Sequence, residues 1–306
     1  MGGQTFTEAI TAVIQKTGGP SRFVGSQFSG LRANGIMFDV ILTPDTGKEW
    51  DFDDFKEIYV NCNLRRRDAD ALQLLDNVRL YDILSYSDFV AGVSMALVGK
   101  VKEGTNEKEQ PVEISGYLGL GFFSLGLDES VELLVTGKPA GAHFKEVQIA
   151  ARWVYIADQS QRIFGYKSLK SVGGEQAYRD VQGIFYLGPA QEKNATIRDY
   201  TGSQSVNLRD SVAFANATGR YEFFTEFGVL YSDPTGVSQD VAISLDGAED
   251  LLIYQEFFSM NKLIEGDSKV IREQEAVLQN IYASRKEKFD VLRQRGNVPA
   301  GFTPAL

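Results

Sequence analysis

The glycines Gly119, Gly121 and Gly126 invite a chemical interpretation, because glycine-rich loops bind the phosphates of nucleotides. A dinucleotide-binding loop needs a third glycine five residues after the first, followed by a helix. Ser124 occupies that position, and the following residues, "DESVELLVTG", have the pattern of a strand. No Gly-Lys-Ser/Thr sequence follows for a P-loop. The pattern therefore favours glycines that permit close packing or a bulge on a buried strand.

Histidine and cysteine, which often serve as nucleophiles, bases or metal ligands, are scarce. His143 is the only histidine, Cys62 is the only cysteine, and no G-x-S-x-G sequence surrounds a serine. The acidic run Asp51–Asp54 suggests calcium, but an EF-hand loop would need glycine in place of Lys56 and glutamate in place of Cys62. We interpret His143 as a turn residue without catalytic duty and the acidic run as a solvated loop.

Two pairs of carboxylates could serve glycoside cleavage, which needs two acids across a cleft. They are Glu129 with Glu132 and Glu222 with Glu226. Neither pair has the alternate spacing that would place both acids on one face of a strand with a third acid between them, so we interpret them as polar strand residues. The sequence predicts no catalytic, cofactor-binding or metal-binding residue and no cofactor, and we expect a protein that is not an enzyme.

Composition narrows the class of protein. The chain has 306 residues, 43% of them hydrophobic and 24% charged, which is typical of a folded globular protein. Its net charge of −10 argues against direct binding of nucleic acid. A single cysteine permits no intrachain disulfide, and synthesis in a reducing cytoplasm is the simplest inference. No secretory leader and no uninterrupted apolar run of about 18 to 20 residues is visible.

The N-terminal residues carry signals of a helix. Thr5 and Glu8 form a capping box, and Gly18-Gly19-Pro20 would end the helix. Its apolar face would need a partner, which could be the body of the same subunit, a neighbouring subunit or a membrane surface. The residues of this face are Phe6, Ile10, Val13 and Ile14. From Ser21 to Gly35 we expect an irregular arm.

Residues 36 to about 254 are dominated by short segments rich in Val, Ile, Tyr and Phe, separated by turn residues. This density of strands predicts an all-β sandwich or barrel. Only residues 68–77 resemble a short helix, and "EDLLIYQEFFSMNKL" fits either a strand or a helix. "GIMFDVIL" at Gly35 and "NLR" at Asn63 are echoed by "GIFYLG" at Gly183 and "NLR" at Asn207. The similar offsets favour two like β-domains.

The C-terminal residues change character again. Asp267 or Ser268 can cap a long amphipathic helix, which Gly296-Asn297 and Pro299 would end. We therefore expect four parts: residues 1–35, an N-terminal helix and arm; 36–170, a first β-domain; 171–263, a second β-domain; and 264–306, a C-terminal helix and tail.

This arrangement resembles the double jelly-roll major capsid proteins of membrane-containing icosahedral phages, of the lipid-containing Flavobacterium phage (FLiP) type. The resemblance rests on "GIMFDVIL" opening a first jelly-roll barrel, "GIFYLG" opening a second, and helices outside both. It implies a protein of the virion shell that self-assembles as a homotrimer into pseudo-hexameric capsomers over an internal membrane. Neighbouring capsomers and other capsid proteins such as the penton would be its partners.

Two other hypotheses remain at this point. A glycan- or receptor-binding β-sandwich protein, such as a phage spike or lectin, would expose aromatic clusters at one end of its loops. A glycan-active enzyme would hold two carboxyl groups about 5 to 10 Å apart in a cleft. Against a genome-binding arm, residues 1–35 carry only Lys16, Arg22 and Arg32 against Glu8. This weak positive charge agrees with a membrane lying between shell and genome.

Overall fold

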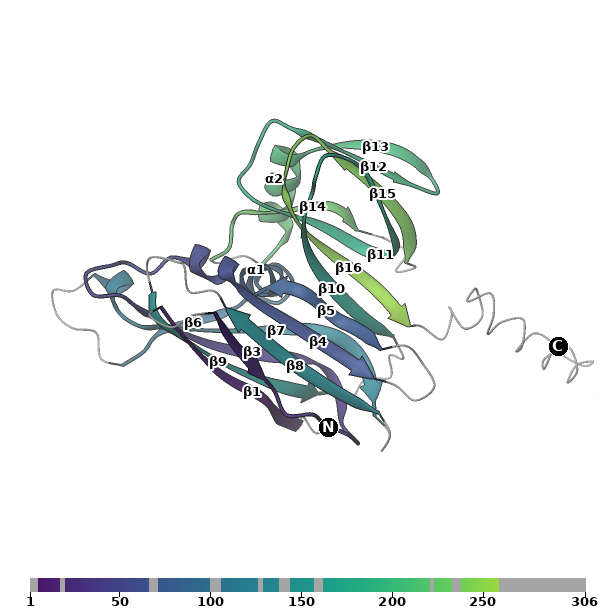
Figure 1. Ribbon diagram of the computed structural model, residues 1–306. Helices are drawn as coiled ribbons and strands as arrows, with labels where there is room; N and C mark the ends of the chain where they lie inside the picture. Colours follow the sequence, from purple (N-terminus) through teal and green to yellow (C-terminus); the bar gives the residue numbers. More distant parts are fainter. Residues whose placement is uncertain are drawn as a thin grey trace, which may run out of the picture. The chain divides into compact units, whose positions relative to one another are not determined.

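The computed structural model describes most of the chain up to Phe258. The described residues are 5–16, 20–65, 71–99, 106–125, 129–137, 144–156, 162–220, 223–232 and 238–258. Within them, sixteen strands and two α-helices confirm the prediction of an all-β protein (Figure 1). The predicted C-terminal helix, residues 264–306, lies outside the described residues.

Ten strands form the first half of the structure, and six strands form the second. The first ten are β1 Thr5–Gln15, β2 Ser21–Val24, β3 Arg32–Pro44, β4 Ile58–Arg65, β5 Leu72–Arg79, β6 Ser94–Leu97, β7 Val112–Ser124, β8 Ser130–Gly137, β9 Phe144–Tyr155 and β10 Ile163–Lys170. The others are β11 Gly174–Leu187, β12 Asn194–Asp199, β13 Gly202–Asn207, β14 Phe227–Ser232, β15 Gln239–Leu245 and β16 Asp250–Phe258. The helices are α1 Leu80–Val90 and α2 Leu208–Thr218, with 3-10 turns η1 Phe52–Glu57 and η2 Glu107–Glu109.

The first half contains two facing runs of paired strands. One has the order β1-β9-β3-β7-β6, and the other has the order β2-β8-β4-β5-β10. Successive residues of these strands alternate between buried and more exposed, as in β4, where Val60, Cys62 and Leu64 are buried and Asn61 and Asn63 are not. Such alternation is what a two-layered β-structure with one core requires, because side chains point to opposite faces of a strand.

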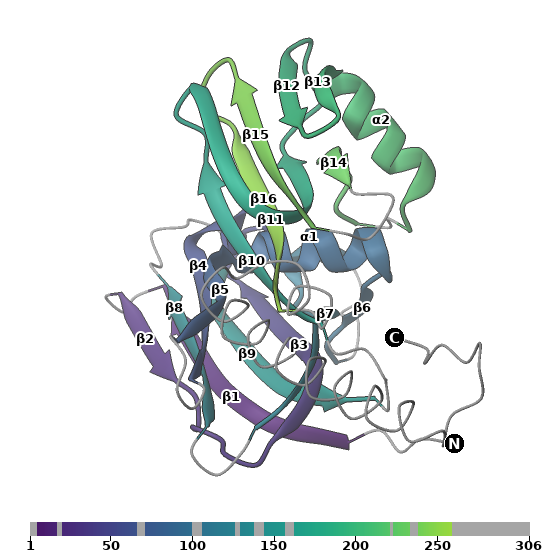
Figure 2. The ribbon, with the colours of Figure 1, turned by 90° about the vertical axis from the view of Figure 1, so that its right-hand side faces the viewer.

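In the second half, the order is β16-β11-β15-β12-β13, with β14 paired to β11 and α2 packed on β14 (Figure 2). The two halves are joined through β16, which pairs with β10 on one side and β11 on the other. The segment that fitted either a strand or a helix is therefore a strand. It needs both neighbours, since Leu251, Leu252 and Ile253 in succession are all buried.

The buried hydrophobic residues form two clusters. The smaller cluster lies wholly in the second half, from Val181 to Ile253. The larger cluster fills the first half and also includes residues of the second half, among them Phe185, Phe227 and Leu252. Helix α1 lies between the two halves in both views (Figures 1 and 2). Its Tyr86 ring is 5.1 Å from that of Phe185.

The predicted N-terminal helix is wrong, because Thr5–Gln15 forms strand β1 at the edge of the first run. β1 pairs with β9 antiparallel from Thr5↔Tyr155 to Gln15↔Glu146, with a bulge between Glu8 and Ile10. The β-branched Ile, Val and Thr residues favour a strand, and pairing with β9 gives the backbone its hydrogen bonds. The predicted irregular arm contains β2 and the first residues of β3.

The helix predicted at residues 68–77 is also wrong over its described part, where β5 starts at Leu72. The true helix, α1, follows at Leu80 and is buried on most sides, so it shows little amphipathic contrast. The echoed "NLR" sequences are not structural equivalents either. The first lies in β4, whereas Asn207 of the second caps α2 by accepting a hydrogen bond from the Arg209 backbone nitrogen at 3.0 Å.

Candidate functional site

The prediction that Gly119 and Gly121 lie on a buried strand, and not in a phosphate-binding loop, is confirmed. Gly119 and Gly121 lie inside strand β7, and no helix follows them. Gly121 has φ +70°, and a Cβ atom there would lie 1.9 Å from the carbonyl oxygen of Arg162. The glycine thus permits the close approach of β10 to β7, where Phe122 donates a backbone hydrogen bond to the same oxygen at 2.9 Å. Gly126 lies outside the described residues.

The candidate nucleophile and the acidic run also have structural roles. Cys62 is fully buried in β4, and burial raises the pKa of its thiol. The acidic run is solvated only in part: Asp51 caps η1 by accepting from the Asp53 backbone nitrogen at 3.0 Å, whereas Asp54 is buried. Among the described residues, no group of three His, Cys, Asp or Glu side chains could hold a metal ion. His143 and Glu222 lie outside them.

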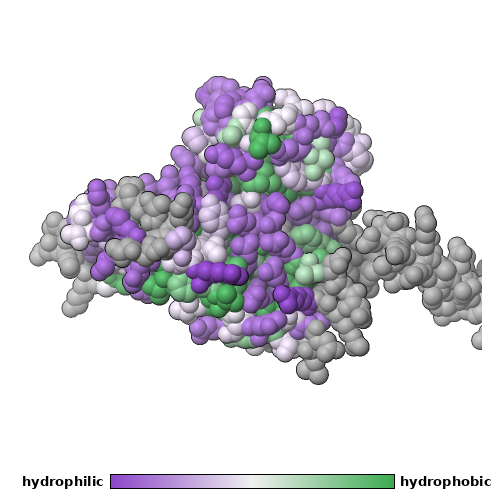
Figure 3. Space-filling model, in the orientation of Figure 1, coloured by the Kyte–Doolittle hydropathy of each residue, from purple (hydrophilic) through white to green (hydrophobic). Residues whose placement is uncertain are grey.

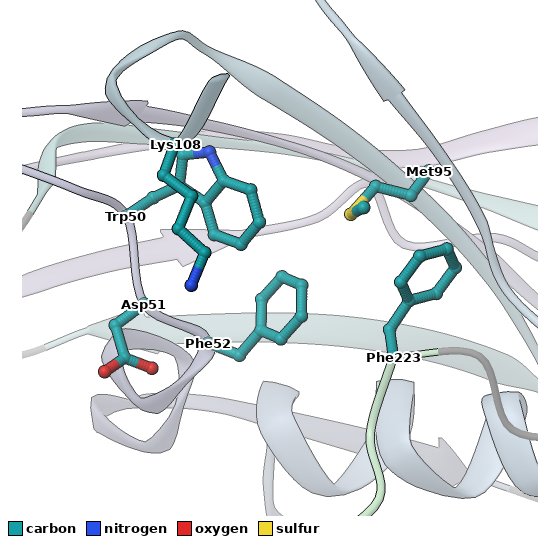
Figure 4. A pocket seen from close by; sticks show the side chains of 6 residues that line it. All are labelled: Trp50, Asp51, Phe52, Met95, Lys108 and Phe223. Carbon is teal, nitrogen blue, oxygen red and sulfur yellow. The ribbon is translucent and has the colours of Figure 1, made fainter. Parts of the chain in front are cut away.

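The structure reveals instead an aromatic pocket, which we define by Trp50, Phe52, Met95, Lys108 and Phe223 (Figure 4). Its volume is about 300 Å³, and Asp51 lies at its edge. Trp50 and Lys108 stand on one side, Met95 and Phe223 on the other, with Phe52 between them (Figure 4). The residues come from η1 and the segment before it, β6, η2 and the segment before β14, so residues far apart in sequence line one recess.

The aromatic pocket has a packed aromatic base. The Phe52 ring stacks on Trp50 with centroids 5.1 Å apart and on Phe224 at 4.6 Å. Tyr81 of α1 meets Phe224 edge-on at 5.5 Å. Such rings are held in place by their neighbours, so the pocket wall is preformed and costs little entropy to order when something binds.

Buried Asp88 fixes one side of the aromatic pocket. Its Oδ2 accepts hydrogen bonds from the backbone nitrogens of Phe223 and Phe224, both at 2.9 Å, and its Oδ1 accepts from Val93 at 3.3 Å. These bonds attach the segment before β14 to the end of α1. On the other side, the Trp50 backbone nitrogen donates to the Lys108 carbonyl at 2.9 Å.

The charges at the aromatic pocket are exposed, whereas its walls are apolar. The Lys108 ammonium lies 5.5 Å from the centre of the Trp50 ring, a cation–π arrangement. Within the described part of the chain Lys108 forms no ion pair. The recess can therefore accept an apolar or aromatic group that carries a negative charge beside it.

The four residues predicted to face a membrane or a partner do not share a face. Ile10 and Ile14 are buried in the first half, with 5% and 0% of their surface exposed. Phe6 and Val13 are 52% and 36% exposed. The period of two of a strand places Val13 on the face opposite to Ile14, and the bulge between Glu8 and Ile10 places Phe6 on the face opposite to Ile10.

Other exposed hydrophobic side chains are scattered over the described surface. Figure 3 shows hydrophobic residues in small groups among hydrophilic ones on the face in view. Three in the second half project strongly, Val172, Tyr200 and Phe214. Isolated exposed hydrophobic residues are ordinary, but large aromatic ones at tips of elements are common anchors of interfaces.

A buried ionic cluster of Arg79, Asp82, Ser168 and Asp250 joins α1 to β10 and β16. Arg79 donates from Nε to Asp82 and from Nη1 to Asp250, each at 2.8 Å, and Ser168 donates to Asp82 at 2.5 Å. Burial raises the pKa of Asp82, and Arg79 and Ser168 offset this only in part. Burial lowers the pKa of Arg79, but its two carboxylate partners outweigh this and raise it. The members of the cluster bind one another, so its role is structural: it holds α1 against β10 and β16.

Comparison with known proteins gives no match to a family model and none to a curated sequence. Comparison with solved structures does give matches. The chain matches the MCP of STIV with a TM-score of 0.55 at 9% identity, over 87% of this chain and 100% of that chain. The fold of the present chain is that of a double jelly-roll major capsid protein.

Two further structures align with lower scores. The major capsid protein P2 from bacteriophage PM2 gives a TM-score of 0.45 at 11% identity, covering 84% of this chain and 99% of that one. The PBCV-1 virus capsid gives 0.44 at 9% identity, covering 84% and 94%. The features specific to the Flavobacterium phage type are not part of this likeness.

In this double jelly-roll chain, no helix within the described ranges is long and apolar enough to cross a membrane. The aromatic pocket was missed from sequence. The signal was present in "EWDFDDF", where three aromatic residues lie within six positions, but the acids of the same segment led to its interpretation as a solvated loop. Met95, Lys108 and Phe223 carry no local pattern, because only the fold brings them to Trp50.

Proposed function

We propose that this protein is a major capsid protein that self-assembles into the shell of an icosahedral virus. The observation that carries the proposal is the double jelly-roll fold shared with the STIV MCP over 87% of this chain. A fold alone does not define a function, so the assembly itself is what must be tested. Its place would be the virion, after synthesis in the host cytoplasm.

The capsomer of this proposal is a homotrimer. Three chains with two jelly rolls each place six similar bodies around one axis, which gives a pseudo-hexameric unit that can tile a shell. The rolls are proposed to divide near residue 170, as in the expected ranges 36–170 and 171–263, with β1 and β2 added to the first roll because they pair with β9 and β8. Neighbouring capsomers and other capsid proteins such as the penton are the further partners, in a shell of phage type over an internal membrane.

The charge of the chain supports a shell that does not itself bind the genome. A net charge of −10 disfavours the binding of phosphates by the chain as a whole. Phe6 and Val13, which project from edge strand β1, are proposed to face a neighbouring subunit or the membrane. We propose that the protein has no catalytic activity.

Light scattering and electron microscopy of the purified full chain test the proposal. We expect particles of three times the chain mass of 33.9 kDa, with a pseudo-hexagonal outline, and shells under assembly conditions. A chain that stays monomeric at high concentration, with and without lipid vesicles, would contradict it.

A further inference from the structure

We propose that the aromatic pocket of one subunit receives the side chain of Tyr200 from a second copy of this chain. The inference rests on the proposed self-assembly and adds the contact that drives it. It concerns two surfaces: the aromatic pocket, which is lined mainly by residues of the first half, and the projecting hairpin between β12 and β13 in the second half.

The hollow place has the size and chemistry for one aromatic side chain. Its volume of about 300 Å³ lies at the lower end of the range for small-molecule sites, about 300 to 1,000 Å³. Trp50, Phe52 and Phe223 offer rings, and Met95 offers a thioether, which packs well against aromatic groups. Since the wall is preformed, insertion of a ring buries apolar surface at small entropic cost.

The projecting place is the hairpin between β12 and β13. Asp199 pairs with Gly202, so Tyr200 and Thr201 form a two-residue turn, and Tyr200 is 75% exposed. Asp199 Oδ1 accepts hydrogen bonds from the Thr201 nitrogen at 2.8 Å and from its hydroxyl at 2.6 Å. These bonds hold the turn, so Tyr200 is presented on a narrow and ordered tip. Tyrosine is among the residue types that most often anchor interfaces.

The charges beside the two places are complementary. Asp199 flanks Tyr200. At the aromatic pocket, the Lys108 ammonium lies 5.5 Å from the centre of the Trp50 ring, whereas Asp51 caps η1 and its carboxylate points away from the rings (Figure 4). The hydrogen bonds from Thr201 lower the pKa of Asp199, which therefore stays ionised at neutral pH. An opposite charge beside an apolar anchor fixes the orientation of docking.

Tyr200 fits a recess better than the other projecting residues of the second half. Phe214 lies on the side of helix α2, so its approach would bring the whole helix against the pocket rim. Val172 has no ring to stack on Phe52. Because the aromatic pocket and Tyr200 are different surfaces, each subunit can give one contact and receive one, and such contacts form a closed ring when the rotation between subunits closes and an open filament when it does not. A trimer is the smallest ring that they can form without an isologous pair.

Cross-linking tests the contact directly. The variants Met95→Cys and Tyr200→Cys are purified separately, mixed, assembled and treated with a bis-maleimide reagent whose spacer spans the length of the missing tyrosine side chain, because two thiols that far apart form no direct disulfide. We expect a cross-linked dimer only in the mixture and not in either variant alone, because the buried Cys62 does not react. The matched controls combine Met95→Cys with Phe214→Cys or with Val172→Cys, and should give no linked dimer.

Association measurements give the second readout. Tyr200→Ser should weaken association at least about 30-fold, the loss expected for an anchor residue, whereas Tyr200→Phe keeps the ring and should stay close to wild type. Met95→Trp fills the pocket and should weaken association, and Met95→Leu should not. Trimers without the Met95–Tyr200 link, or with unchanged affinity in Tyr200→Ser, would overturn the docking and leave the capsid proposal standing. A wild-type chain that is always monomeric would overturn both.

Discussion

At the scale of single residues, Arg79 joins the two carboxylates of the buried ionic cluster. Its guanidinium binds both Asp82 and Asp250. Arg79→Met would leave the fully buried Asp82 carboxylate without a counter-charge, which should lower the free energy of unfolding by about 3 to 5 kcal/mol. The matched control is Arg198→Met, which breaks an exposed pair with Glu175 and should cost less than about 1 kcal/mol. Urea unfolding measures both, and equal costs would contradict the structural role of Arg79.

Asp82 should make stability depend on pH in a direction opposite to that of most paired carboxylates. Its pKa is raised above the ordinary value of 3.8 in the folded protein, so near that pH the folded chain binds a proton that the unfolded chain releases. The free energy of unfolding should then fall as pH rises from 3.8 through the raised pKa.

The variant Asp82→Asn isolates this effect. It cannot ionise, and Arg79 keeps Asp250 as its partner. Subtracting the stability of the variant from that of wild type between pH 3.5 and 7 should give a difference that decreases with pH. A difference that increases with pH would mean that Arg79 holds the pKa of Asp82 below 3.8.

Gly119 and Gly121, two of the three glycines of β7, should respond oppositely to the same substitution. Gly121→Ala places a Cβ atom 1.9 Å from a backbone oxygen, at a φ of +70°, and should cost more than about 2 kcal/mol. Gly119→Ala meets nothing closer than 3.8 Å and should be neutral or stabilising by up to about 1 kcal/mol. Thermal unfolding of the two variants checks this, and similar costs would show that the β7–β10 contact adjusts freely.

At the scale of elements, strand β1 buries one residue and exposes the next. Ile14 is fully buried and Val13 points outward, whereas one helical face would bury both. Ile14→Ala should therefore cost about 2 to 5 kcal/mol, and Val13→Ala less than about 1 kcal/mol. Urea unfolding of the two variants provides the comparison. Equal and small costs would show that β1 contributes little to the core. Removal of residues 1–18 would then leave the subunit stable.

The elements also show which parts of a structure local sequence can predict. Strands with one buried face, such as β4 and β8, follow from alternation because the core itself imposes the period of two. β1 was mistaken for a helix because Phe6, Ile10, Val13 and Ile14 satisfy a helical spacing while Ile10, Ala12 and Ile14 satisfy a strand. The choice depends on β9, which lies more than a hundred residues away. α1 was missed because a helix buried between two halves has no polar stripe.

The aromatic pocket marks a stronger limit of the same kind. Phe52 and Trp50 are neighbours in sequence, but Met95, Lys108 and Phe223 reach them only through β6, η2 and the bonds of Asp88. The all-β class was nevertheless predictable from the density of strands and turns, and the double jelly roll was expected from the resemblance to phage capsid proteins. A large number of strands is a property of the whole architecture, whereas a pocket is made by a few contacts between distant loops.

At the scale of the whole molecule, the two jelly rolls share buried surface. The larger hydrophobic cluster extends from the first roll to Phe185 and Phe227 of the second, and the Tyr86 ring of α1 contacts Phe185, Phe227 and Tyr254. A boundary near residue 170 would therefore separate the chain's strands but not its core. We expect the rolls to unfold together, in one cooperative transition.

Two probes test this cooperativity, because both tryptophans, Trp50 and Trp153, lie in the first roll. Tryptophan fluorescence reports the first roll, and hydrogen exchange of β15 reports the second. The two should give the same urea midpoint, and Tyr86→Ala should lower both midpoints equally, since it removes packing at the shared core. Phe214→Ala, on the exposed side of α2, should change neither. If exchange in β15 became fast at urea concentrations where the fluorescence is still native, the second roll would unfold by itself. The shared cluster would then be a weak interface between independent domains.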